Sequence, residues 1–191
     1  TRLLADRYPH ARIVGLDLSG DMLTVAQSRL VDTDADIHLQ QGSMHRLPFR
    51  NASFDLVTGG YAIRNAPDLG TALNEIRRVL RPGGVAAFLD FSKSPRPVLA
   101  AFQIALLTVW GSTWGWVIHR NPDTYRYIAA SLRGYPDREE LTRLLRQMGF
   151  RNIVNRPFFF GFTCATLAIN SMTDPADPRP ATRPSRGHRA H

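Results

Sequence analysis

The stretch FDLVTGGYAIRN, at residues 54–65, has the pattern of a strand that ends in a binding site. It begins with the apolar run FDLV, breaks at Gly59 and Gly60, and ends with Arg64 beside Asn65. A helical pattern follows directly. In open α/β sheets, ligands bind in the crevice outside the carboxyl ends of the strands. We therefore predict that this segment forms one lip of an active site.

The segments around this lip alternate between short apolar runs and helical patterns. Ser19 is suited to cap the first complete helix, and Met22, Ala26 and Leu30 recur at the spacing of a buried helical face. Strands are predicted at 12–18, 37–40, 54–58 and 85–91, and a second helix starts at Pro67. This order predicts an α/β fold with a Rossmann-like, doubly wound, mostly parallel sheet and right-handed crossovers.

Residues 98–118 carry no charged side chain and contain the three tryptophans of the chain. The segment is long enough to cross a bilayer, but polar residues and glycines dilute it. Three interpretations stay open: a membrane-spanning helix, a buried or lid-forming helix pair, and a surface that touches lipid.

The C-terminal third predicts two helices followed by a hairpin. One helix is expected at 121–132, and Asp137 with Glu140 has the spacing of a capping box at the start of the next. Strands at 153–155 and 158–170 are predicted to form an antiparallel hairpin that closes the sheet.

The composition is that of one globular domain with a polar tail. We expect a folded domain at 1–170 and a disordered, Arg- and Pro-rich tail at 171–191. The net charge of +8 allows attraction to anionic lipid or nucleic acid, or simply reflects arginines on solvated helix faces. No compact stripe combines arginine with aromatic residues, so we expect no nucleic-acid partner.

Cysteine and histidine usage narrows the chemistry further. The single cysteine, Cys164, excludes an internal disulfide, fits the reducing cytoplasm, and is expected to be a core residue of a late strand. The six histidines show no metal-ligand spacing with this cysteine, so we predict no metal site.

Asp17 ends the first predicted strand. In Rossmann-like sheets a carboxylate at this position accepts hydrogen bonds from the ribose hydroxyls of a nucleoside, whereas the alternative is an aspartate that caps the helix beside Ser19. The glycine-rich turn that accompanies such a carboxylate belongs about 20 residues upstream. Among the 16 residues before Asp17, the only glycine is Gly15. We therefore expect that the glycine loop and the first central strand are missing from this chain, as in an N-terminal truncation.

An ordered set of strings resembles the class I S-adenosylmethionine-dependent methyltransferases. These strings are GLDLSGDML, GSMHRLPF, FDLVTGGYAIRN, EIRRVLRPGGVAAFLDFSKS and YRYIAASLRGYPDREELTRLLRQMGF. Within that class the chain is similar to the menaquinone/ubiquinone biosynthesis C-methyltransferases (the UbiE family) over residues 10–169. The resemblance implies S-adenosylmethionine as cofactor and methylation of a ring carbon of a polyprenyl quinol.

The resemblance also implies roles for individual cofactor-binding residues. Asp17 would hold the ribose of S-adenosylmethionine, and Met22 would pack beside the adenine. Ser43 and Met44 would flank the adenine, although related enzymes often carry an acidic residue near Ser43. Gly60 would lie near the methionyl part.

Arg64 and Asn65 match the arginine–asparagine pair that this family places beside the quinol. We predict Arg64 as the stabiliser of a phenolate, oriented by Asn65, because arginine stays protonated. The alternative for Arg64 is a surface salt bridge. His45 and Tyr61 are further candidates for a proton acceptor, and the alternative for His45 is a loop histidine.

The resemblance gives the uncharged segment a use. Residues 98–118 would form part of the wall that faces the prenyl tail of the lipophilic quinol, with peripheral contact to the inner face of the membrane. Two other functions stay open: a methyltransferase for another lipophilic phenol, and a non-catalytic remnant that has lost the cofactor loop.

Overall fold

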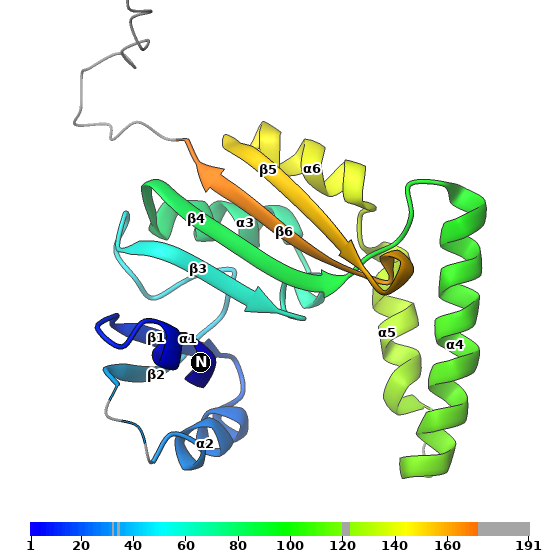
Figure 1. Ribbon diagram of the computed structural model, residues 1–191, viewed down its shortest axis with the longest axis horizontal. Helices are drawn as coiled ribbons and strands as arrows, with labels where there is room; N and C mark the ends of the chain where they lie inside the picture. Colours follow the sequence, from blue (N-terminus) through cyan, green and yellow to red (C-terminus); the bar gives the residue numbers. More distant parts are fainter. Residues whose placement is uncertain (32, 34, 120–122, 172–191) are drawn as a thin grey trace, which may run out of the picture.

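A computed structural model describes residues 1–31, 33, 35–119 and 123–171. The predicted tail at 171–191 therefore lies outside the described residues, except for Ser171. The elements, drawn in Figure 1, are α1 (Arg2–Arg7), β1 (Ile13–Asp17), α2 (Gly20–Ser28), β2 (Ile37–Gln41), β3 (Phe54–Gly60), η1 (Ile63–Asn65), α3 (Leu69–Val79), β4 (Leu80–Phe91), α4 (Pro97–His119), α5 (Asp123–Gly134), α6 (Arg138–Gln147), β5 (Phe150–Phe158), η2 (Phe159–Gly161) and β6 (Thr163–Asn170).

The strands form two hydrogen-bonded groups. The larger sheet has the order β3-β4-β6-β5, with β3 parallel to β4 and with β6 antiparallel to both of its neighbours. The smaller sheet is the parallel pair β1-β2. The α/β class and the antiparallel C-terminal hairpin are confirmed. Among the strands described, β1 pairs only with β2 and β3 only with β4, so each keeps one unpaired edge.

The core lies between the larger sheet and its helices. On α3, the apolar residues at helical spacing are buried, including Leu73 and Ile76. The helix starts later than predicted, because Asp68 caps it through the backbone N–H of Thr71 and Pro67 precedes the cap. The remaining core side chains are Ile63, Leu80, Ala86, Phe88, Leu132, Tyr135, Leu141, Leu145, Phe150 and Ala168.

The smaller sheet corrects one prediction. Ser19 caps α2 as expected, since its hydroxyl accepts from the N–H of Met22 at 3.3 Å. The predicted buried face of this helix is wrong: α2 has no buried residue, and Met22 is 53% exposed. The helix packs mainly on the narrow β1-β2 pair, which cannot cover a full helical face.

The uncharged segment forms one long helix, α4, and not a pair of helices within 98–118. It runs beside α5, and the two helices project from one end of the larger sheet in Figure 1. Among the described helices, none is long and apolar enough to cross a membrane. Residues 121 and 122, which begin the predicted helix at 121–132, lie outside the described residues.

The C-terminal elements follow the local signals closely. The capping box is complete, since Asp137 accepts from the N–H of Glu140 and Glu140 accepts from the N–H of Asp137. Cys164 is buried on β6 as predicted. The boundary at residue 158 is wrong, because Phe158 ends β5 and η2 separates it from β6.

Candidate functional site

Hydrogen bonds bring the segments that follow β1, β2 and β3 toward one another. The N–H of Gly42 donates to the carbonyl of Asp17 at 3.0 Å, which places Ser43 and Met44 beside the end of β1. His45 extends this chain of contacts, since its Nε2 accepts from the N–H of Asp68, just after η1. The predicted cofactor side and the predicted acceptor side therefore meet along one series of loops.

The hydrogen bond from Asp68 leaves His45 poorly suited to accept a proton. Its Nε2 accepts from Asp68 at 3.2 Å, so the ring proton belongs on Nδ1, which lies 3.4 Å from the hydroxyl oxygen of Ser43. A nitrogen that already accepts a backbone hydrogen bond is a poor general base. The structure therefore favours the alternative of a loop histidine for His45.

Of the cofactor-binding candidates, Asp17 and Gly60 are exposed at the carboxyl ends of β1 and β3, whereas Ser43 and Met44, which follow β2, are half-buried. Asp17 is exposed, and its Oδ1 accepts from the N–H of Ser19 at 2.9 Å. One oxygen thus stabilises the turn into α2, and Oδ2 is the candidate acceptor for a ribose hydroxyl. A Cβ added to Gly60 would meet no atom within 4 Å, so space remains there for a bound group. These residues fit a nucleoside with an extended substituent.

Arg64 is buried inside the protein. Its backbone N–H and its Nε donate to the two carboxylate oxygens of Asp90 on β4, at 3.1 and 3.2 Å. Its Nη1 donates to the hydroxyl of Ser131 on α5 at 3.0 Å. The side chains of Arg64 and Asp90 are only 3% and 5% exposed, so this is a buried ion pair and not the surface salt bridge that the sequence left open.

Asp90 sits in an apolar environment that opposes its charge. Burial raises the pKa of the Asp90 carboxyl above its usual range, and the hydrogen bond and charge of Arg64 offset part of this effect. The guanidinium carbon of Arg64 also lies 5.1 Å from the centre of the Phe91 ring. The ion pair thus ties η1 to β4 and α5.

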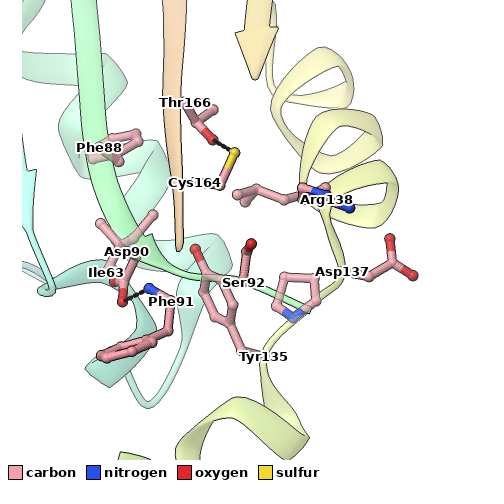
Figure 2. Close-up of a pocket in the computed structure, with 12 residues that line it drawn as sticks. Ile63, Phe88, Asp90, Phe91, Ser92, Tyr135, Asp137, Arg138, Cys164 and Thr166 are labelled. Atoms are coloured by element: carbon pink, nitrogen blue, oxygen red, sulfur yellow. Dashed lines mark hydrogen bonds between the residues drawn. The ribbon is translucent and has the colours of Figure 1, made fainter. Parts of the chain in front are cut away.

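A small cavity lies beside this ion pair (Figure 2). Asp90, Ser92, Tyr135 and Cys164 are among the residues that line it. Tyr135 is 6% exposed, and its hydroxyl has no hydrogen-bond partner among the described residues. Burial, and next the charge of Asp90, raise the pKa of Tyr135 far above its usual range. At about 10 Å³ the cavity is too small for an aromatic ring, so we interpret this region as a support for Arg64.

Tyr61 and Asn65 are exposed and lie close to the buried Arg64 in the chain. Tyr61 follows β3 with φ of 55°, and its ring lies 5.2 Å from that of Phe91. The backbone N–H of Tyr61 donates to the carbonyl of Leu89 at 2.7 Å, and the side-chain amide of Asn65 donates to the carbonyl of Tyr61 at 3.1 Å. A bulky residue in the left-handed region costs conformational energy, and such strain is often found at binding sites.

The sequence patterns did not identify Asp90, Ser131 and Tyr135 as neighbours of the site. The signal for Asp90 was present, because a carboxylate inside the apolar run VAAFLDF has to be paired. The partner of that carboxylate lies 26 residues earlier in the chain, and no local pattern marks it. In the part of the chain that the structure describes, no group of three or more His, Cys, Asp or Glu side chains could hold a metal ion.

Comparison with known sequences gives consistent matches. The model of the ubiE/COQ5 methyltransferase family matches residues 2–170. The demethylmenaquinone methyltransferase of Staphylococcus haemolyticus is 34% identical over 164 residues, covering 86% of this chain and 68% of that protein. The enzyme of the same name from Staphylococcus carnosus is 35% identical over 160 residues, covering 83% and 66%. The chain therefore spans about two thirds of the length of these relatives.

Solved structures support the fold. A Haloferax volcanii chain from a complex with the Trm112 methyltransferase activator aligns with a TM-score of 0.65 and 20% identity, covering 90% of this chain and 77% of that one. The phosphoethanolamine N-methyltransferase 2 of Haemonchus contortus aligns with a TM-score of 0.66 and 15% identity, covering 90% and 46%. At such low identity these matches concern the fold alone, and they confirm the predicted Rossmann-like methyltransferase fold.

Proposed function

The chain belongs to the ubiE/COQ5 methyltransferase family, and from this membership we propose that it methylates a ring carbon of a lipophilic quinol of the demethylmenaquinol type. Membership confirms the predicted family and the methyltransferase class, and with them S-adenosylmethionine as methyl donor. The observation that supports the quinol is the name shared by the curated relatives, demethylmenaquinone methyltransferase. A non-catalytic remnant is the less favoured alternative.

The cofactor residues keep their predicted roles as proposals. When bound, S-adenosylmethionine supplies an electrophilic methyl group on a sulfonium. Asp17 Oδ2 accepts from the ribose, while Met22, Ser43 and Met44 provide surface for the adenine at the ends of β1 and β2. Gly60 leaves room for the methionyl part, because a side chain there would project into the open space at the end of β3.

The acceptor side has to make a ring carbon nucleophilic. Carbon reacts once a ring hydroxyl has lost its proton and the negative charge has spread over the ring. We assign the quinol to the exposed surface of Tyr61 and Asn65, next to which the chain carries the buried cation of Arg64. A guanidinium fixed by Asp90 and Ser131 needs no reorganisation to stabilise a developing phenolate. Asn65 remains our candidate for direct contact with the quinol, and Arg64, whose side chain is 3% exposed, is a candidate that acts on the phenolate at a distance through its charge.

The arrangement of the chain adds two further proposals. Residues 1–170 form the methyltransferase domain, with α4 as part of the wall that faces the prenyl tail. The protein works in the cytoplasm, in peripheral contact with the inner face of the membrane. The uncharged sequence at 98–118 supports the prenyl-facing wall and the membrane contact, since an enzyme for a membrane-anchored tail benefits from an apolar rim.

The test uses the full-length protein with a short-tailed quinol and S-adenosylmethionine. Asn65→Ala should lower kcat/KM at least about 10-fold, because a positioning contact beside the ring is lost. Its affinity for S-adenosylhomocysteine should stay within about 2-fold, because the cofactor contacts are on β1 to β3. Asn74→Ala is the matched control, since Asn74 is an exposed asparagine on the neighbouring helix α3. Equal kcat/KM in the two variants would contradict the assigned role.

A further inference from the structure

Two exposed apolar features lie at the same end of the molecule. The first is a stripe along α4, in which Val98, Phe102, Leu106 and Val109 follow one another at helical spacing. Phe102 is 63% exposed and Val109 is 65% exposed. We call the exposed set Val98, Leu99, Phe102, Leu106, Val109 and Trp110 the α4 stripe.

The second feature is the tip of the β5–β6 hairpin. Three consecutive phenylalanines, Phe158 to Phe160, are 46%, 78% and 102% exposed, and we call them the aromatic tip. Phe159 and Phe160 have φ of 49° and 56°, in the left-handed region that favours glycine or asparagine. A turn that only had to reverse the chain would not need bulky residues here. We therefore interpret the exposed phenylalanine rings as a surface for binding a partner.

The base of the aromatic tip is firmly attached. The backbone N–H of Ser92 donates to the carbonyl of Phe162 at 2.9 Å, and the hydroxyl of Ser92 donates to the carbonyl of Gly161 at 2.8 Å. Ser92 itself is buried. A ring held on a fixed backbone loses little conformational entropy when it inserts into a partner.

The aromatic tip and the α4 stripe are neighbours. A Cβ added to Gly161 would lie 3.6 Å from Nε2 of Gln103, which is on α4 between Leu99 and Leu106. Gln103 is buried, and its Oε1 accepts from the N–H of Ser94 at 2.8 Å. Figure 1 shows the tip beside the N-terminal half of α4, away from the β1-β2 pair.

We propose that the aromatic tip and the α4 stripe together form a docking surface for an anionic lipid bilayer. The apolar residues would enter the boundary between headgroups and acyl chains. Arg156 lies two residues before the tip, and Arg96 lies directly before α4; both are exposed. Cations at the rim of an uncharged apolar surface complement anionic headgroups. The proposal rests on the proposed function, because a substrate with a membrane-embedded tail requires the enzyme to reach the bilayer.

The experiment measures co-sedimentation of the full-length protein with vesicles of phosphatidylcholine, with or without phosphatidylglycerol. The wild-type protein should bind the vesicles that contain phosphatidylglycerol. The double variant Phe159→Ser, Phe160→Ser should lower the partition coefficient at least about 10-fold, since two rings no longer leave water. The matched control Leu3→Ser, Val31→Ser removes two apolar side chains that are 84% and 73% exposed. They belong to α1 and to the segment after α2, both far from the tip in Figure 1. The control variant should change binding less than about 2-fold.

Three outcomes would overturn the docking surface. The first is wild-type protein that binds neither kind of vesicle, and the second is a tip variant that binds as well as the wild type. The third is a dimer by light scattering that becomes a monomer in the tip variant while vesicle binding is unchanged, because the surface would then serve a second copy. Methylation of a short-tailed quinol without vesicles should persist in the tip variant. Its absence in the wild type would refute the proposed function, and vesicle binding would still be measurable.

Discussion

Replacement of Asp90 by alanine is predicted to lower the free energy of unfolding by about 3–5 kcal/mol, as for other broken buried ion pairs. The structure gives the reason. Asp90 accepts hydrogen bonds from the N–H and Nε of Arg64 and from the N–H of Phe91. With side chains 3% and 5% exposed, neither charge can turn to solvent. Alanine at position 90 leaves a buried guanidinium without its carboxylate and two backbone donors without their acceptor.

A double-mutant cycle measures the interaction itself. Arg64→Met and Asp90→Leu are combined in the full-length protein, and unfolding in urea is followed by tryptophan fluorescence. We expect the double variant to be more stable than either single variant, with a coupling energy of at least about 2 kcal/mol, because it buries no unpaired charge. Asp90→Asn retains the shape and one acceptor, so it should be less destabilising than Asp90→Ala. Additive single effects, or a cost of Asp90→Ala below about 1 kcal/mol, would refute the argument.

Three further predictions concern other groups. The hydrogen bond with Arg78 lowers the pKa of Glu75. The contribution of the Glu75 carboxylate to stability is therefore present above the ordinary glutamate pKa and is lost as the pH falls through the lowered value. Glu75→Gln should reduce the fall in Tm on acidification, and an unchanged dependence of Tm on pH would contradict this. Tyr135→Phe should be neutral or stabilising by up to about 1 kcal/mol in urea unfolding, because its buried hydroxyl has no hydrogen-bond partner among the described residues, and a large loss would show an unrecognised partner. Asp17→Ala should weaken S-adenosylhomocysteine binding by about 10-fold in calorimetry, the value of one charge-assisted hydrogen bond, and unchanged affinity would remove the ribose role.

The features that the sequence predicted well are set by short-range physics. The capping box at Asp137 and Glu140 depends on residues three apart, and the structure contains both of its hydrogen bonds. The strand predicted at 54–58 was recognisable from its apolar run, although β3 continues through Gly59 and Gly60. The order of these elements was enough to predict an α/β fold, since helices that alternate with strands have few ways to pack.

The features that the sequence predicted poorly depend on distant partners. The buried state of Arg64 follows from Asp90 and from Ser131 on α5, which lie 26 and 67 residues away. Three phenylalanines in a row favour a strand, so the sequence could not show that two of them occupy left-handed positions in a turn. The face of α2 has the period of a buried helix, but exposure is decided by the width of the sheet beneath it.

The proposed methylation of a ring carbon is tested directly by identifying the product of the reaction. Full-length protein is incubated with S-adenosylmethionine that carries a trideuterated methyl group and with a demethylmenaquinol, and the quinone fraction is analysed by fragmentation mass spectrometry. We expect a trideuteromethyl group on a ring carbon of the product, with the ring hydroxyls unmodified. Transfer of the label to a hydroxyl oxygen, or an unlabelled quinone with cofactor bound to the protein, would contradict it.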